Sequence, residues 1–346
     1  MNSITVVIQS ETLVRIFLLG FLGFAVSMLI TPIYTTLAYR GQWWKKPRTT
    51  DVSGKPATEF QKLHAAKHRR NIPTMAGLIV IIGVAIVTLL FNLSREQTWL
   101  PLAAMVGAGL VGLIDDYINI RGDGTGVAGL RSKLKLFLIM GVATVGGIWF
   151  YAKNGIDSFH VPVIGAVSIG WLIVPLFVLV VVATANAVNI SDGLDGLAGG
   201  LLTSAFGVYT LIAFLQQRYG VAAFCLTMCG ALLAYVWFNI FPARFFMGDV
   251  GSFALGTALG VVAMITDTLL LLPVIGLVFV AEAGSVIIQN ISKKLRNGKK
   301  IFRISPIHHH FEAIGWPETK VTMRFWVIGN VCAVVSIALA ILGGFV

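Results

Sequence analysis

Five aspartates stand at the ends of long apolar segments, where an ionisable side chain is rare unless it has a function. They are Asp115, Asp116, Asp192, Asp195 and Asp249. Three separate connections carry them, and the topology predicts that all three lie on one membrane face. Mg²⁺ prefers oxygen ligands and usually binds one or two carboxylates together with substrate phosphates. The pattern therefore predicts a shallow acidic site suited to phosphoryl transfer, in which a metal ion absorbs charge on phosphate oxygens.

The first two acids are adjacent, in the run Gly112-Leu113-Ile114-Asp115-Asp116-Tyr117. Adjacent carboxylates repel each other, so such a pair attracts a cation or serves as a general base. The alternative is a helix-end charge that is merely exposed to water. Because the pair closes an apolar segment, we favour a functional role.

The second group lies between Asn186 and Gly196, where polar residues recur at positions 186, 189, 192 and 195. Residues three apart lie on one face of a helix, so these side chains form a polar stripe. The glycines that follow permit a turn and close approach of backbone to a ligand. A plain polar connection between two spans is the alternative, but it would not need this regularity.

The third group places Asp249 between Gly248 and Gly251, shortly after Asn239 and Phe246. A carboxylate flanked by glycines suits a metal ligand or a nucleophile that must touch its substrate. Phe246 is a candidate for stacking on a base, although a phenylalanine at a membrane interface is more often an anchor.

Three consecutive histidines, His308, His309 and His310, follow a proline in a basic segment near the C-terminus. Consecutive side chains point in different directions, so they rarely bind one metal ion. Imidazoles here are candidates to bind phosphate or carboxylate groups, and a solvated loop is the alternative. Glu282 lies inside an apolar segment, where it has a functional role or pairs within the bundle.

The elements that must position these side chains are membrane helices. Hydrophobic residues make up 57% of the 346 residues and charged residues only 12%. This composition excludes a soluble globule, a disordered chain and, despite a net charge of +11, a soluble nucleic-acid binder. A span needs about 20 apolar residues. We predict an all-α polytopic integral membrane protein, a single domain over 1–346, with ten spans: 13–38, 74–92, 98–114, 133–151, 171–188, 196–216, 220–238, 250–267, 269–291 and 321–345.

The basic residues predict the orientation, because Lys and Arg are concentrated in cytoplasmic loops. Of the 26 such residues, 22 fall in the four connections 39–73, 115–135, 239–249 and 292–324. That side is therefore cytoplasmic, and an even number of spans places both termini outside. Topology explains most of the basic excess, although some of these residues are also candidates to meet anionic lipid or nucleotide phosphate.

One motif is misleading. Gly107, Gly109 and Gly112 spell G-x-G-x-x-G, but they lie within the third span with no strand before them. We expect them to allow close helix packing instead.

These residues together resemble the polyprenyl-phosphate N-acetylhexosamine-1-phosphate transferases. The shared blocks are Pro73 to Gly77, Asp115 to Tyr117, Asn186 to Gly196, and Phe246 to Ser252. The block Pro306-Ile307-His308-His309-His310-Phe311-Glu312, with Gly315-Trp316 and Arg324-Phe325-Trp326, resembles the branch whose sugar carries a peptide.

The resemblance implies a reaction. Undecaprenyl phosphate attacks UDP-N-acetylmuramoyl-pentapeptide and gives lipid I and UMP, a membrane step of peptidoglycan biosynthesis. It also implies Mg²⁺ as cofactor, a homodimer, no nucleic-acid partner, and a place in the bacterial cytoplasmic membrane with the active site facing the cytoplasm.

The resemblance also implies residue roles. Asp249 matches the Mg²⁺ ligand, and Asp115 and Asp116 match the pair that deprotonates or positions the lipid phosphate. The residues that match the uridine and diphosphate pocket are Asn189, Asp192, Asp195, Asn239 and Phe246, with Thr74 and Lys133 beside it. His308, His309 and His310 match the loop that engages the sugar-peptide.

The chain departs from the family pattern at Asn71, Ile72 and Ala76 in the first block, and at Asn119 and Ser191. Two other functions stay open at this point. One is transfer of N-acetylglucosamine-1-phosphate, against which the histidine block argues. The other is secondary transport, against which the clustering of carboxylates at one interface and the absence of an internal repeat argue.

Overall fold

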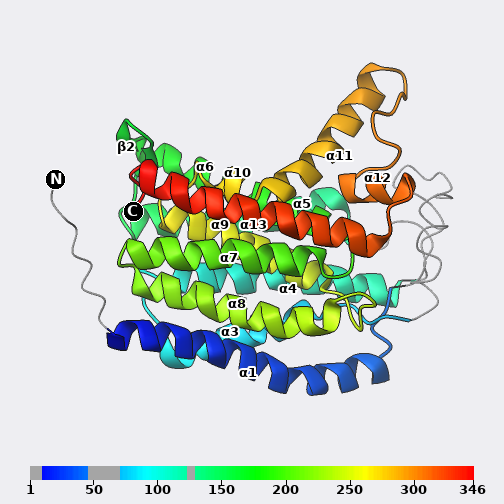
Figure 1. Ribbon diagram of the computed structural model, residues 1–346, viewed down its shortest axis with the longest axis horizontal. Coiled ribbons are helices and arrows are strands. Elements are labelled where there is room, and N and C mark those ends of the chain that lie inside the picture. Colours follow the sequence, from blue (N-terminus) through cyan, green and yellow to red (C-terminus); the bar gives the residue numbers. More distant parts are fainter. Residues whose placement is uncertain (1–9, 46–70, 123–128) are drawn as a thin grey trace.

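The computed structural model describes residues 10–45, 71–122 and 129–346, and these are almost entirely helical (Figure 1). The helices are α1 (Ser10–Arg40), α3 (Gly77–Phe91), α4 (Trp99–Arg121), α5 (Ser132–Ala152), α6 (Ile173–Ser191), α7 (Leu197–Leu215), α8 (Tyr219–Asn239), α9 (Gly248–Ile265), α10 (Leu272–Ile275), α11 (Leu277–Leu295), α12 (Ile307–Ala313) and α13 (Glu318–Leu342). A 3-10 turn, Gly170–Leu172, precedes α6.

The expectation of an all-α polytopic membrane protein is confirmed. Within the described residues, eight helices are long and apolar enough to cross a membrane, and α3, with 15 residues, is a shorter apolar helix. Each predicted span contains helix. The third extends further than expected, because α4 continues through Asp115 and Asp116 to Arg121.

The ninth predicted span, 269–291, is not one straight helix. Pro273 lies in the first turn of the four-residue α10, and Gly276 separates α10 from α11. Figure 1 shows α11 leaving the bundle at an angle, and the chain returning from its far end to α12 beside the bundle. Hydropathy is averaged over a window of about 20 residues, so it does not reveal the short break at Gly276 or the polar last turns of α11.

The long helices lie side by side in Figure 1, and α8 and α9 are the most buried of the candidate spans. Helix α8 packs against α1 and α7, and α9 packs against α4 and α6. Nearly all of α9 is buried inside the bundle. The outer helices α1, α5 and α13 instead expose large apolar side chains, such as Phe17, Phe137 and Val334. Such a surface is suited to lipid rather than to water.

Glycines allow the central helices to approach one another closely. A Cβ at Gly112 of α4 would lie 2.2 Å from the carbonyl oxygen of Asp249, at the start of α9. A Cβ at Gly77 of α3 would lie 2.2 Å from the Cα of Gly251. The interpretation of the glycine motif in α4 as a packing surface is therefore confirmed at Gly112.

The two ends of the bundle differ. The start of α1 and the C-terminus lie at the left end in Figure 1, near a hairpin of β1 (Ser158–Val161) and β2 (Gly165–Ser168) that the sequence did not predict. His160 of β1 contacts the C-terminal segment, with its Nε2 2.9 Å from the carbonyl oxygen of Gly343. The end of α1, the end of α4 and the starts of α5 and α9 meet at the opposite end, and there the carboxylates gather.

Candidate active site

Asp115, Asp116 and Asp249 form one cluster. One carboxylate oxygen from each lies within 4.8 Å of the others. Asp115 and Asp116 are buried at the last turns of α4, and the Asp249 side chain is 17% exposed in the first turn of α9. The sequence predicted that three connections deliver five aspartates to one face, and the structure brings three of them, from two connections, into one cluster.

Two lysines hold the three carboxylates together. The Lys135 Nζ atom lies 2.9 Å from Asp115 Oδ2 and 2.6 Å from Asp249 Oδ2. The Lys45 Nζ atom lies 2.8 Å from Asp116 Oδ1 and 3.4 Å from Asp249 Oδ1. Asp249 therefore lies between two ammonium groups, and each of those groups also contacts one acid of the α4 pair.

Backbone groups complete the carboxylate cluster. The N–H of Val250 donates to Asp116 Oδ2 at 3.0 Å, and the N–H of Leu130 donates to Asp115 Oδ1 at 2.7 Å. Gly248 has a φ of +76°, and a Cβ there would lie 2.4 Å from Asp116 Oδ2. Only glycine therefore allows α9 to begin directly against the acids of α4.

The formal charges of the cluster are three negative and two positive, which leaves one net negative charge. All three donors are carboxylates, the hard oxygen ligands that suit Mg²⁺ or a similar ion. The residues present thus fit a divalent metal. Burial alone would lower the pKa of Lys45, but Asp249 and Asp116 hold it above its usual value. Lys45 is therefore a cation at any physiological pH.

The second predicted group lies beside the carboxylate cluster. Asn189 donates from Nδ2 to the Ser252 hydroxyl at 2.8 Å, and that hydroxyl donates to the Gly248 carbonyl at 3.1 Å. The end of α6 is thereby tied to the start of α9. Asp192 is half-buried and caps the C-terminus of α6.

Asp195 and Asn239 are buried and hold loops in place. Asp195 Oδ2 accepts from the N–H of Ala243 at 2.9 Å. Asn239 Oδ1 accepts from the N–H of Gly196 at 3.0 Å, and its Nδ2 donates to the Phe245 carbonyl at 2.9 Å. Both side chains therefore shape the backbone between α8 and α9.

Thr74 and Phe246 lie on two segments that pair like short strands. The Phe246 N–H donates to the Pro73 carbonyl at 2.8 Å, and its carbonyl accepts from the Ala76 N–H at 3.0 Å. Thr74 is buried, whereas the Phe246 ring is half-buried. The neighbouring Phe245 is the core residue, in contact with Tyr34 and Phe238.

The histidine block forms α12 rather than a loop. His308 and His309 are buried, with ring centroids 4.1 Å apart. His308 Nδ1 lies 2.8 Å from Glu282 Oε2 on α11, and His309 Nδ1 lies 2.7 Å from Glu312 Oε2. Burial and the neighbouring His308 lower the pKa of His309. His310 Nδ1 accepts from the Arg303 N–H at 3.2 Å.

His308 also connects the histidine block to the aspartate loop. A Cβ at Gly193 would lie 2.3 Å from His308 Nε2, so the imidazole lies directly on that glycine. The sequence predicted that the glycines here allow close approach of backbone to a ligand, whereas in the structure the group that lies against Gly193 is a histidine of the same chain.

Three residues of the site were missed. Lys45 and Lys135 hold the carboxylates, but nothing in the sequence separates them from the other lysines of their segments. Lys133, which the family pattern suggested, is exposed two residues before Lys135 and makes no contact with the cluster. Glu282 was noted without a role, and a carboxylate inside an apolar helix was the signal that could have assigned one.

The sequence matches one family profile, that of Glycosyl transferase family 4, over residues 98–267. This stretch contains all three carboxylates of the cluster, Lys135 and the Asn189–Gly196 loop.

Curated relatives match nearly the whole chain. A phospho-N-acetylmuramoyl-pentapeptide-transferase from Chloroflexus aurantiacus is 38% identical over 96% of this chain and 92% of its own length. Proteins with the same name from Geobacillus sp. strain WCH70 and Bacillus mycoides are 37% and 36% identical. They align with 91% and 92% of this chain, and with 95% and 96% of their own lengths.

Proposed function

The chain belongs to the phospho-N-acetylmuramoyl-pentapeptide-transferase family, and we propose that it transfers the phospho-sugar-peptide of UDP-N-acetylmuramoyl-pentapeptide to undecaprenyl phosphate. It is a membrane phosphotransferase of cell-wall synthesis. The products of the proposed reaction are lipid I and UMP. We further propose that it works in the bacterial cytoplasmic membrane as a single-domain homodimer, with the carboxylate end facing the cytoplasm.

The observation that carries this proposal is the carboxylate cluster with its two lysines. Both substrates are phosphates, and the reaction must bring two groups of like charge into contact. The cluster supplies metal-ligand oxygens and two ammonium groups within one site. Preorganised cations at phosphate oxygens are what phosphoryl transfer requires.

In the proposed step, a phosphate oxygen of the lipid attacks the β-phosphorus of the nucleotide substrate. A new P–O bond forms, the bond from that phosphorus to the bridging oxygen breaks, and UMP leaves with the electron pair. One diphosphate replaces another, so the reaction is close to balanced and reversible. A bound Mg²⁺ would supply charge neutralisation at the phosphate oxygens.

The residues of this chain would act mainly by positioning. The second pKa of a phosphate monoester is about 6, so at pH 7 the lipid phosphate is already mostly a dianion. Removing its last proton therefore lowers the barrier only slightly. Orientation of the two phosphates can contribute several kcal/mol more. We assign that task to Asp115 and Asp116, with Lys45 and Lys135 drawing the phosphates in and Asp249 as Mg²⁺ ligand.

A one-step transfer is favoured over a covalent aspartyl intermediate. Both oxygens of Asp115 and both of Asp116 already accept a backbone N–H or pair with a lysine. Both oxygens of Asp249 face lysines. A carboxylate engaged in this way is a weak nucleophile.

The remaining site residues keep the roles that the family resemblance implies. Asn189, Asp192, Asp195, Asn239 and Phe246 border the proposed uridine and diphosphate pocket. Thr74 and Lys133 are proposed as polar contacts beside that pocket. We propose that His308, His309 and His310 engage the sugar-peptide, through α12.

UMP release tests the proposed function. Purified protein in detergent with Mg²⁺ and undecaprenyl phosphate should release UMP when UDP-N-acetylmuramoyl-pentapeptide is added, and should not with UDP-N-acetylglucosamine. Release with the glucosamine substrate alone would reassign the enzyme to the related transfer reaction. Absence of release with either substrate, from protein shown to be folded, would contradict the transferase and favour transport.

Glu282 is expected to orient His308. Glu282→Gln should lower kcat/KM about tenfold, the scale seen when a partner that orients a functional histidine is removed. The double variant Glu282→Gln/His308→Gln should have the same kcat/KM as His308→Gln alone, because both changes disrupt the same Glu282–His308 pair. Glu96→Gln, at an exposed acid at the opposite end of the bundle, is the control and should leave kcat/KM unchanged. Additive losses in the double variant would show that Glu282 acts independently of His308.

A further inference from the structure

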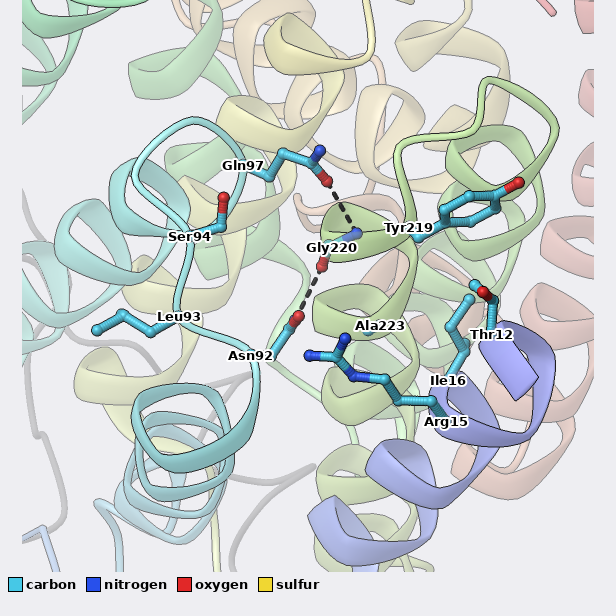
Figure 2. A pocket seen from close by; sticks show the side chains of 10 residues that line it. All are labelled: Thr12, Arg15, Ile16, Asn92, Leu93, Ser94, Gln97, Tyr219, Gly220 and Ala223. Atoms are coloured by element: carbon cyan, nitrogen blue, oxygen red, sulfur yellow. Dashed lines mark hydrogen bonds between the residues drawn. The ribbon is translucent and has the colours of Figure 1, made fainter. Parts of the chain in front are cut away.

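A second polar cavity lies far from the carboxylate cluster, at the end of the bundle where α1 begins (Figure 2). It forms where α1, the α3–α4 loop and the start of α8 meet. Arg15 lies in it, 25 residues before the end of α1, and a helix rises 1.5 Å per residue. The cavity is therefore roughly 37 Å from the end of α1 that leads to Lys45. It is not part of the catalytic site.

The cavity has a volume of about 260 Å³. A single water occupies about 30 Å³ in the liquid, so the cavity admits a group of many atoms. Its lining contains both polar and apolar residues. The polar residues are Thr12, Arg15, Asn92, Ser94, Gln97 and Tyr219.

Arg15 gives the cavity a positive charge. One guanidinium N–H, on Nη2, donates to the Phe91 carbonyl at 2.9 Å, and the group makes no ion pair with any described residue. Glu11 and Glu96 belong to the segments that form the cavity, yet neither lines it or pairs with Arg15. Figure 2 shows the guanidinium directed across the cavity toward Asn92. An arginine fork suits the oxygens of a phosphate.

The far wall of the cavity is fixed by hydrogen bonds. Gln97 Oε1 accepts from the N–H of Gly220 at 2.8 Å, and Asn92 Nδ2 donates to the Gly220 carbonyl at 2.9 Å. A Cβ at Gly220 would lie 2.6 Å from Gln97 Oε1, so a larger residue there would displace the Gln97 side chain. These hydrogen bonds fix the α3–α4 loop against the start of α8 and so keep this wall of the cavity in place.

Hydroxyl groups around the cavity remain available. The side-chain hydroxyls of Thr12, Ser94 and Tyr219 make no hydrogen bond with other residues in the described part of the chain. Figure 2 shows the Tyr219 hydroxyl directed away from Arg15, so the cation and the free hydroxyl donors that line the cavity are Arg15, Thr12 and Ser94. That combination suits a phosphate ester with further oxygen atoms.

The surroundings point to a lipid as the source of that phosphate ester. Val14, beside Arg15, is 65% exposed, and Phe91 and Leu93, on either side of Asn92, are 53% and 46% exposed. The cavity lies at the ends of helices long enough to cross a membrane, which is the depth of lipid headgroups. A bound headgroup would leave its acyl chains against this apolar surface.

We propose that this cavity binds the headgroup of an anionic phospholipid, with Arg15 pairing to its phosphate and the hydroxyls of Thr12 and Ser94 donating to its oxygens. The site is separate from the transferase site, and it does not depend on which lipid or nucleotide the enzyme converts.

The test measures lipid binding to full-length protein that has been delipidated in a neutral detergent. Phosphatidylglycerol, phosphatidylcholine and glycerol phosphate are titrated, with bound lipid counted by native mass spectrometry and the thermal midpoint followed in parallel. Phosphatidylglycerol should bind at least about fivefold more tightly than phosphatidylcholine. Arg15→Gln should weaken phosphatidylglycerol binding about tenfold, equivalent to about 1.4 kcal/mol.

Arg95→Gln is the matched control, because Arg95 is exposed at the same end and does not line the cavity. It should leave binding within twofold. Ala223→Leu fills the cavity from α8 without changing charge and should also weaken binding, with UMP release reporting that the distant active site is folded.

Equal losses in the Arg15 and Arg95 variants would overturn the proposal, because they would indicate general attraction to a basic surface. Unchanged binding in the Ala223 variant would place the lipid elsewhere and also overturn it. Glycerol phosphate binding as tightly as phosphatidylglycerol would assign the cavity to a free phosphate ester and remove the lipid.

Discussion

Asp249→Asn should lower kcat by about 1000-fold or more while the protein stays folded. Asp249 is the acid shared between the two lysines, and it faces both acids of α4. The amide keeps the shape but removes one charge from the donor set. Loss of about 4 kcal/mol of stabilisation of the transition state corresponds to a 1000-fold rate change.

The measurement is UMP release at saturating substrates, together with calorimetric titration of Mg²⁺ in the absence of substrate. The variant should lose metal binding as well as turnover. Glu96→Gln, which neutralises an exposed acid at the opposite end of the bundle, is the control and should change neither. Near-normal turnover in Asp249→Asn would remove Asp249 from the metal site.

Lys135→Gln should lower kcat/KM about 100-fold, whereas Lys133→Gln should stay within about threefold. The Lys135 ammonium contacts Asp115 and Asp249, and the Lys133 side chain is exposed. Removing one preorganised charge from a site that binds developing charge costs about 2.7 kcal/mol, or 100-fold.

The two lysines are two residues apart on α5, so this pair of variants has the same chemistry and nearly the same position. Rates are measured with both substrates, and thermal midpoints are compared because Lys135→Gln also leaves buried Asp115 short of a partner. The reverse order of effects would make Lys133, the residue that the family resemblance selected, the more important of the two lysines.

Much of the architecture could be predicted from the sequence. Each predicted span contains helix. A run of about 20 apolar residues is stable in lipid wherever it lies in the bundle, and there it must satisfy its backbone hydrogen bonds as a helix. The aspartates were also visible, because a carboxylate at the end of such a segment is costly unless it is used. Neither the apolar segments nor the carboxylates at their ends depend on which helices pack against each other.

The break between α10 and α11 and the helix at His308–His310 could not be predicted in the same way. Gly276 and Pro273 are tolerated in a straight membrane helix as well as in a broken one. The histidines of α12 are buried only because Glu282 and Gly193 meet them, and these residues lie 26 and 115 positions away from His308.

The sequence alone therefore determined the membrane class and the acids of the candidate site. The tertiary structure decided which cation faces which acid, that Asp195 and Asn239 hold loops, and that Lys135 rather than Lys133 reaches the cluster. The physical reason is that each apolar segment is transferred from water into lipid whatever its neighbours are, so its sequence alone reveals it. The partner of a charge depends on the rotation and packing of whole helices, and close contacts such as that of Gly112 with Asp249 set that packing.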